Sequence, residues 1–163
     1  MSNDGGLDAR VEDWAVGLLT ALESSSQAVF KTVAPWAEQI GSFKTGGGEQ
    51  SFDRFAPFAF VKVVPGSPDG EKVGGTDCLE FIRLHVSIGQ ADDSPGVARR
   101  GSSSKLGVSK IRELVFDLLN DAHPGSGFAC DVFEYEAIAD YDLGTDENRA
   151  GYELVFKANN IIA

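Results

Sequence analysis

The sequence predicts an α+β domain: a single mostly antiparallel or mixed β-sheet of four to five strands with two amphipathic helices packed on one face. Several stretches alternate apolar and polar residues, which is the period of a strand with one buried side. Two other stretches repeat apolar residues at helical spacing. Strands and helices that each present one apolar surface bury it most economically against each other. We therefore expect one domain over residues 1–163, with residues 1–6 disordered.

The first predicted helix covers residues 8–23. Apolar side chains from Leu7 to Leu22 recur every three or four residues, and acidic residues lie early, where the helix dipole favours them. A short strand is expected over residues 28–33, and Pro35 ends it because proline cannot donate to a sheet.

A long loop is predicted over residues 37–57, since the three glycines at 46–48 make this stretch flexible. These glycines do not form a phosphate-binding loop, because no strand precedes them and no Lys-Ser/Thr pair follows. Residues 58–64 are almost continuously apolar and predict a central strand covered on both faces. A turn rich in proline and glycine leads to the next strand, over residues 79–88, which is expected to pair antiparallel with it.

The strand over residues 79–88 and the helix over residues 105–121 form the predicted centre of the domain. One face of the strand is apolar: Ile82, Leu84, Val86 and Ile88. The helix carries about six large apolar side chains, each worth roughly 1.5–3 kcal/mol when fully buried, and the serines at 102–104 are expected to cap its N-terminus. Residues 128–138 and 152–158 then predict a closing hairpin.

Composition excludes several classes of function. The net charge is −11 and the pI is about 4.5, so the chain repels nucleic acid and we expect no sequence-specific DNA or RNA binding. No apolar run approaches the roughly 18–20 residues of a membrane-spanning helix. The N-terminus lacks the basic start and apolar centre of a signal peptide, so we expect a cytoplasmic protein without a membrane partner.

Catalytic signatures are missing from the sequence. His85 and His123 lie in segments that have no reason to converge, and no G-x-S-x-G motif occurs. Cys78 and Cys130 lie in apolar surroundings and are interpreted as buried thiols. We expect no enzyme, no cofactor and no metal.

A calcium-binding loop is the rival interpretation of one acidic stretch. Asp140, Asp142 and Asp146 stand at positions one, three and seven of such a loop, but Thr145 replaces the required glycine and Gly151 replaces the last carboxylate. A polar hairpin turn explains the stretch better. A small ligand- or calcium-binding domain remains the alternative from another functional class.

The loop over residues 89–104 is the predicted contact site. Loops of this length in compact domains are usually functional or disordered. Its glycines have Walker A spacing, but Ser102 stands where the lysine must be, which rules out ATP binding. Its charged residues could either contact a partner or compensate one another locally, and both interpretations stay open. The candidate contact residues are Asp92, Asp93, Arg99, Arg100 and Lys105.

Three segments together resemble a known family. They read Val-Phe-Lys-Thr-Val-Ala-Pro-Trp-Ala-Glu from Val29, Ala-Pro-Phe-Ala-Phe-Val-Lys-Val-Val from Ala56, and Leu-Gly-Val-Ser-Lys-Ile-Arg-Glu-Leu-Val from Leu106. This order is similar to that of the tail terminator, or tail completion, proteins of long-tailed, Mu-like phages and prophages. The likeness covers essentially the whole chain and rests on diffuse apolar patterns. The glycines at 46–48 and the loop over residues 89–104 depart from the family pattern.

The resemblance implies a small structural α+β subunit that assembles with itself into a ring, typically a hexamer. Such a ring sits on the end of the tail tube, stops its polymerisation and offers a surface to the head–tail connector or neck protein. Assembly takes place in the host cytoplasm, the product belongs to the virion tail, and DNA passes through the ring. Arg99 and Arg100 are then expected to contact the next subunit or the tube. Another ring-forming phage neck or tail subunit is the alternative within this class.

Overall fold

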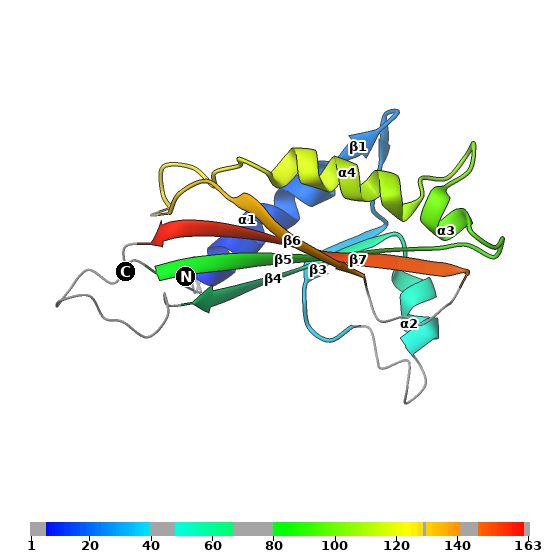
Figure 1. The fold of residues 1–163 in the computed structure, drawn as a ribbon, viewed down its shortest axis with the longest axis horizontal. Helices are drawn as coiled ribbons and strands as arrows, with labels where there is room; N and C mark the ends of the chain where they lie inside the picture. The colour runs from blue at the N-terminus through cyan, green and yellow to red at the C-terminus, as the bar shows by residue number, and fades with distance from the viewer. Residues whose placement is uncertain (1–5, 40–47, 67–79, 129, 141–146, 162–163) are drawn as a thin grey trace, which may run out of the picture.

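The computed structural model describes residues 6–39, 48–66, 80–128, 130–140 and 147–161. Five strands form one sheet in the order β3-β4-β5-β7-β6 (Figure 1). β3 pairs parallel with β4, and the other neighbours pair antiparallel. The strands are β3 (Thr32–Pro35), β4 (Phe58–Gly66), β5 (Glu80–Ala91), β6 (Glu134–Asp140) and β7 (Arg149–Ile161). The mixed sheet confirms the predicted α+β class.

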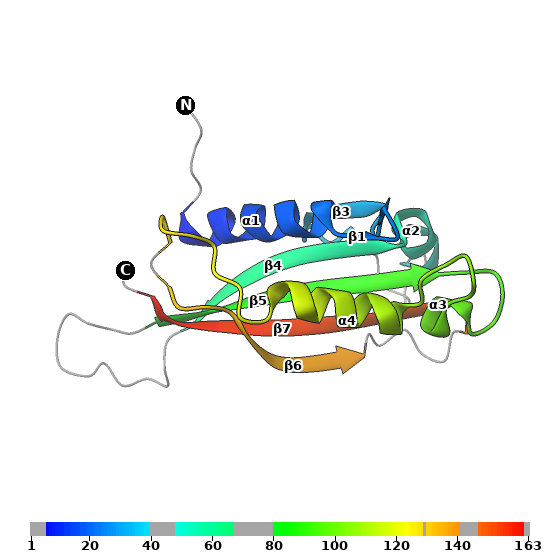
Figure 2. The same ribbon diagram turned by 90° about the horizontal axis from the view of Figure 1, so that it is seen from above.

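Two helices, α1 (Leu7–Ala21) and α4 (Val108–Leu119), lie on the same face of this sheet, as Figure 2 shows from above. Both helices contribute fully buried side chains to one apolar core, in which the alternating residues of β5 are also buried. The core includes Val11, Leu19, Ile111 and Leu119. The predicted packing of two amphipathic helices on one face is therefore confirmed.

The opposite face of β4 carries a second, smaller core that the sequence analysis missed. Phe58 and Phe60 point away from α1 and α4 and pack against Phe52 of α2 (Gly48–Phe55), which is only 1% exposed. The prediction of a loop throughout residues 37–57 was wrong. A helix of two turns is stabilised mainly by tertiary packing, and its pattern is too short to stand out in sequence.

Residues 23–35 also differ from the single predicted strand. β1 (Glu23–Ser24) and β2 (Gln27–Ala28) form a small separate hairpin. Two serines with positive φ make its turn, and β3 begins only at Thr32. Pro35 ends β3 as predicted, and proline on an edge strand is the position a sheet tolerates.

The segment predicted as a loop over residues 89–104 is partly regular. β5 continues to Ala91, and a short helix, α3 (Val97–Arg100), follows. The serines at 102–104 do not cap α4, because that helix starts at Val108 after Gly107, with no side-chain cap hydrogen bond. The chain between α3 and α4 folds back on itself instead, which moves the helix start beyond the serines.

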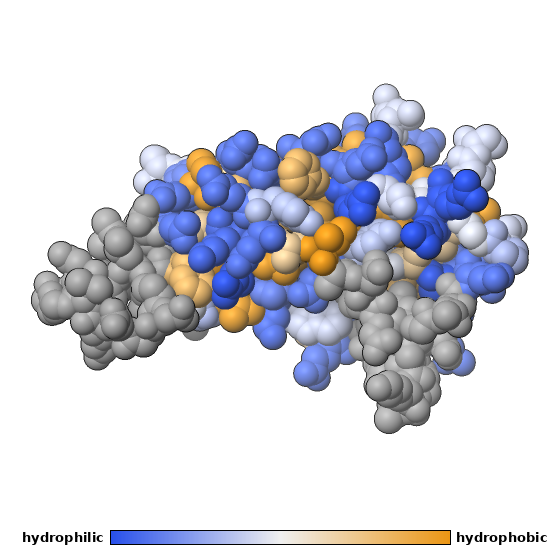
Figure 3. Space-filling model, in the orientation of Figure 1, coloured by the Kyte–Doolittle hydropathy of each residue, from blue (hydrophilic) through white to orange (hydrophobic). Residues whose placement is uncertain are grey.

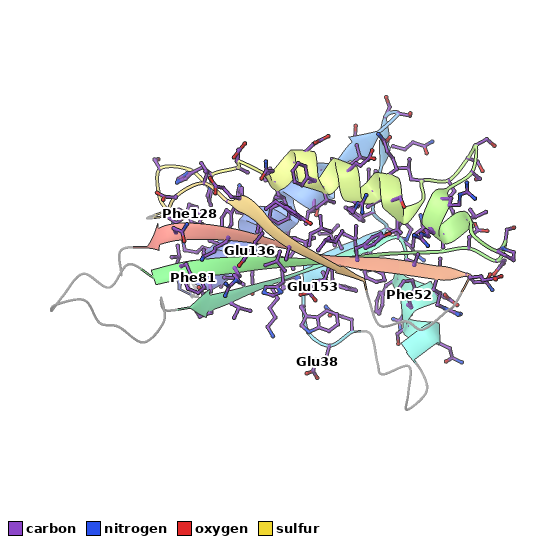
Figure 4. All side chains as sticks on the ribbon, in the orientation of Figure 1. Glu38, Phe52, Phe81, Phe128, Glu136 and Glu153 are labelled. Carbon is purple, nitrogen blue, oxygen red and sulfur yellow. The ribbon has the colours of Figure 1, made fainter. Side chains whose placement is uncertain are left out.

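The sheet face turned away from α1 and α4 is polar beyond α2. Arg83 donates two hydrogen bonds to Glu136, at 2.8 and 3.0 Å, and His85 Nδ1 lies 2.7 Å from Glu153 Oε1. Figure 4 labels Glu136 on β6 and Glu153 on the neighbouring β7. The alternation predicted for β5 thus separates a buried face from a face of paired charges. No described helix is long and apolar enough to cross a membrane.

Candidate protein-contact surfaces

Lys105 and Asp92 hold the contact loop, residues 92–105, against the end of β5. The Lys105 amine donates to the Ala91 carbonyl at 2.9 Å and to Asp92 Oδ2 at 2.7 Å. The other carboxylate oxygen of Asp92 accepts the Ser94 N–H at 2.8 Å. The hydrogen bond from Lys105, followed by that from Ser94, holds the pKa of Asp92 below its ordinary value. These two predicted contact residues therefore position the loop.

A close approach of two glycines forms the base of the same loop. Gly101 has φ 81° and ψ 178°, a conformation open essentially to glycine alone. A Cβ at Gly101 would lie 2.7 Å from the Gly107 nitrogen. The neighbouring Ser102 N–H donates to the Lys105 carbonyl at 2.9 Å. The loop is thus braced from inside by backbone contacts.

Arg99 and Arg100 stand on this braced base and face solvent. Both are exposed, and neither has an ion-pair partner among the residues that the structure describes. Asp93 is exposed as well. The contact role of this loop stays a prediction, and among the described residues local compensation within the loop is seen for one pair. Lys105 compensates Asp92 locally, whereas the two arginines remain available for a partner.

A groove between α4 and the edge strand β6 is a surface that sequence reasoning did not find. It has a volume of about 410 Å³. Tyr135 and Ile138 of β6 form one wall and are each 37% exposed. Phe116 of α4 meets the Tyr135 ring edge-on at a centroid distance of 5.3 Å, and the buried Leu154 of β7 adds to the lining. Figure 3 shows hydrophobic side chains reaching the surface on this side of the molecule.

Charged side chains of α4 complete the lining. Arg112 lies over the Tyr152 ring at 5.3 Å, and Glu113 pairs with Lys110 at 3.2 Å. Asp117 is exposed and has no partner within the described part of the chain. The groove therefore offers an exposed aromatic ring, apolar walls and an unpaired carboxylate. The sequence shows which residue types are present, but it does not show that they lie close together. Their proximity follows from β6 being an edge strand that α4 covers only in part.

The remaining predicted residues do not form a site together. His85 pairs with Glu153 on the sheet, whereas His123 Nε2 lies 2.8 Å from the Cys130 carbonyl oxygen. Cys130 is a half-buried free thiol, and burial, with a smaller effect from Asp131, raises its pKa. Such a thiol is a weak nucleophile.

The calcium alternative falls largely outside the described residues. Asp142 and Asp146 are not described, and for Asp140 only the backbone of β6 is. Cys78 also lies outside the described residues. Among the residues that are described, no three His, Cys, Asp or Glu side chains gather as a metal site would require.

The chain is an α+β domain with two exposed surfaces of different chemistry, the loop with Arg99 and Arg100 and the groove between α4 and β6. A scan against models of known protein families finds no match. A search of curated proteins finds none either. What the protein does is therefore inferred from its fold and its exposed surfaces.

Proposed function

We propose that this chain is a structural phage or prophage tail protein without enzymatic activity. It forms a ring on the end of the tail tube, stops tube polymerisation and provides the surface that joins the head. Its partners are further copies of itself, the tail tube protein and the head–tail connector or neck protein. Assembly takes place in the host cytoplasm, and the ring remains in the virion tail.

The single observation that supports this proposal most is that one small chain has two exposed surfaces of different chemistry. A ring of identical subunits needs a head-to-tail contact, in which one surface meets a different surface of the next copy. The loop with Arg99 and Arg100 supplies exposed cations. The groove between α4 and β6 supplies apolar walls and the carboxylates of Glu113 and Asp117, and its one lining cation, Arg112, lies over the Tyr152 ring.

Charge and fold agree with this role. A net charge of −11 keeps a ring from adhering to DNA that passes through it. The family resemblance implied a small α+β subunit, and the fold belongs to the α+β class. The loop over residues 89–104, where the chain departs from the family pattern, is braced by backbone contacts, as a contact element should be.

Tube length is the test of this function. Tubes are assembled from purified tail tube protein with and without this chain, and their lengths are measured by negative-stain microscopy. The proposal predicts that the chain stops elongation and lies at tube ends. Unchanged lengths with no density at the ends would refute it. An equal molar amount of serum albumin controls for crowding.

A further inference from the structure

We propose that Arg99 and Arg100 of one copy enter the groove between α4 and β6 of a second copy. This inference rests on the self-assembly proposed above and specifies the contact that carries it. The occupant of the groove is thus a defined segment of this same chain, α3 with its two arginines. Each copy can insert its loop into the groove of the next, which is the head-to-tail contact that a ring requires.

The chemistry of the groove matches a guanidinium group. The arginine guanidinium stacks on aromatic faces and forms planar, bidentate hydrogen bonds with carboxylates. Tyr135 presents an exposed ring, and Asp117 presents a carboxylate without a partner in the described part of the chain. The volume of about 410 Å³ falls within the range of roughly 300–1,000 Å³ typical of binding pockets, so it accommodates entering side chains.

The charges of this chain favour a second copy as the occupant. Several other cations in the described residues have carboxylate partners: Arg83 pairs with Glu136, Lys105 with Asp92, and Arg149 with Asp53. Arg99 and Arg100 are unpaired within the described residues, as is Asp117. The two loop cations and the groove carboxylate therefore complement each other in charge between copies.

The positions of the two surfaces suit a head-to-tail contact. α3 lies at one end of the long axis of the molecule, whereas α4 and β6, whose side chains line the groove, run along that axis (Figures 1 and 2). A copy that inserts its loop into a neighbour keeps its own groove free for a third copy. Because α3 at the end of one copy binds the side of the next copy, successive copies are rotated relative to one another. Repeated contacts of this kind close into a ring when the rotation permits.

Strand addition to β6 is the competing way to use this edge, and the strand itself opposes it. β6 carries a register shift between Tyr135 and Ala137, and Glu134 and Glu136 are exposed along it. Bulges and charges of this kind protect edge strands from pairing with another chain. A contact by side chains in the groove avoids that obstacle.

Cross-linking between two differently labelled proteins tests the contact. Both proteins carry Cys78→Ala and Cys130→Ala. One adds Ser103→Cys in the exposed loop beside the arginines, and the other adds Glu113→Cys at the groove, which leaves Asp117 intact. The two proteins are mixed and treated with a short bismaleimide. Gln27→Cys, on the exposed β1–β2 hairpin, replaces Ser103→Cys in the matched control.

We expect the Ser103→Cys and Glu113→Cys mixture to form a cross-linked pair at roughly tenfold the control yield, because docking raises the local concentration of the two thiols. Adding R99E and R100E to the Ser103→Cys protein should return the yield to that of the control. Equal yields in all mixtures, or a yield that survives the charge reversal, would overturn the proposed contact. Tube-length measurement is an independent readout. If the chain still terminates tubes but the cross-link does not form, the proposed contact is wrong and the tail function stands. If the cross-link forms but tubes are not terminated, the tail function is wrong and the contact stands.

Discussion

At the scale of single residues, two glycines with similar φ set the shape of the contact loop in different ways. Gly96 has φ 80° and open space where a Cβ would stand. Gly101 has φ 81°, but a Cβ there would meet backbone atoms at 2.7 and 2.8 Å. The backbone alone therefore disfavours alanine at both positions, and crowding by the backbone adds to the penalty only at Gly101.

The two alanine substitutions should separate these effects. Gly96→Ala should lower the free energy of unfolding by about 1 kcal/mol through its left-handed backbone. Gly101→Ala should lower it by about 3 kcal/mol, because the loop base must also open. Urea denaturation of both variants measures the difference. Equal losses would show that the close approach to Gly107 does not brace the loop.

Asp92 gives the loop a dependence on pH. Its folded-state pKa is lowered, first by the hydrogen bond from Lys105. The carboxylate therefore stabilises the folded chain fully above its ordinary pKa of 3.8, and this contribution is lost as the pH falls through the folded-state pKa. An NMR titration should find the pKa of Asp92 below 3.8 in the native chain and closer to 3.8 in Lys105→Met. An unchanged pKa in that variant would contradict the contact.

At the scale of elements, α2 is an anchored helix and not a surface turn. Phe52 packs edge-on against Phe58 at a centroid distance of 4.9 Å. The neighbouring Asp53 receives two hydrogen bonds from Arg149 at the start of β7, at 2.8 and 2.6 Å. Gly89 of β5 makes room for this cluster, since a Cβ there would strike the Phe58 and Phe52 rings.

Phe52→Ala should therefore lower the free energy of unfolding by about 3–5 kcal/mol, the usual cost of removing a buried phenylalanine. Gln50→Ala on the exposed side of the same helix should change it by less than about 0.5 kcal/mol. Urea denaturation measures both variants. A small loss for Phe52→Ala would mean that α2 contributes little to the fold.

The elements that sequence predicts well are those with long, regular apolar patterns. α1, α4 and β5 repeat their apolar residues over three turns or four alternations, so the pattern survives local exceptions. α2 and α3 are too short for such a pattern, and their packing partners lie far along the chain. Their positions could not be read from local sequence.

The candidate site divides in the same way. The sequence alone draws attention to Arg99 and Arg100, because two adjacent cations without a nearby acidic residue are unusual in an acidic chain. The role of Lys105 depends on its distance to Asp92, which sequence does not contain. The groove depends on Tyr135 and Ile138 lying at a sheet edge, which follows from strand order and not from residue type.

At the scale of the whole molecule, assembly should depend on complementary charge. R99E with R100E in one protein, and D117R in another, should each abolish tube capping. Combining all three substitutions in one chain should restore capping at least in part, because the charges are exchanged between the two surfaces. Lys62→Glu, which changes an exposed charge on the far sheet face, is the control and should cap normally. Loss of capping by the control, or no rescue by the combined variant, would contradict the head-to-tail contact. Tube-length distributions report the result.

Imaging of tube ends tests the central claim, a closed ring of this chain on the tail tube, most directly. Tubes assembled with the chain are imaged end-on by negative-stain microscopy, and the end density is averaged without imposed symmetry. The account predicts a closed ring of repeated subunits at one end of each tube, built from a fixed number of copies. Bare tube ends, or open-ended chains of subunits of varying length, would contradict it.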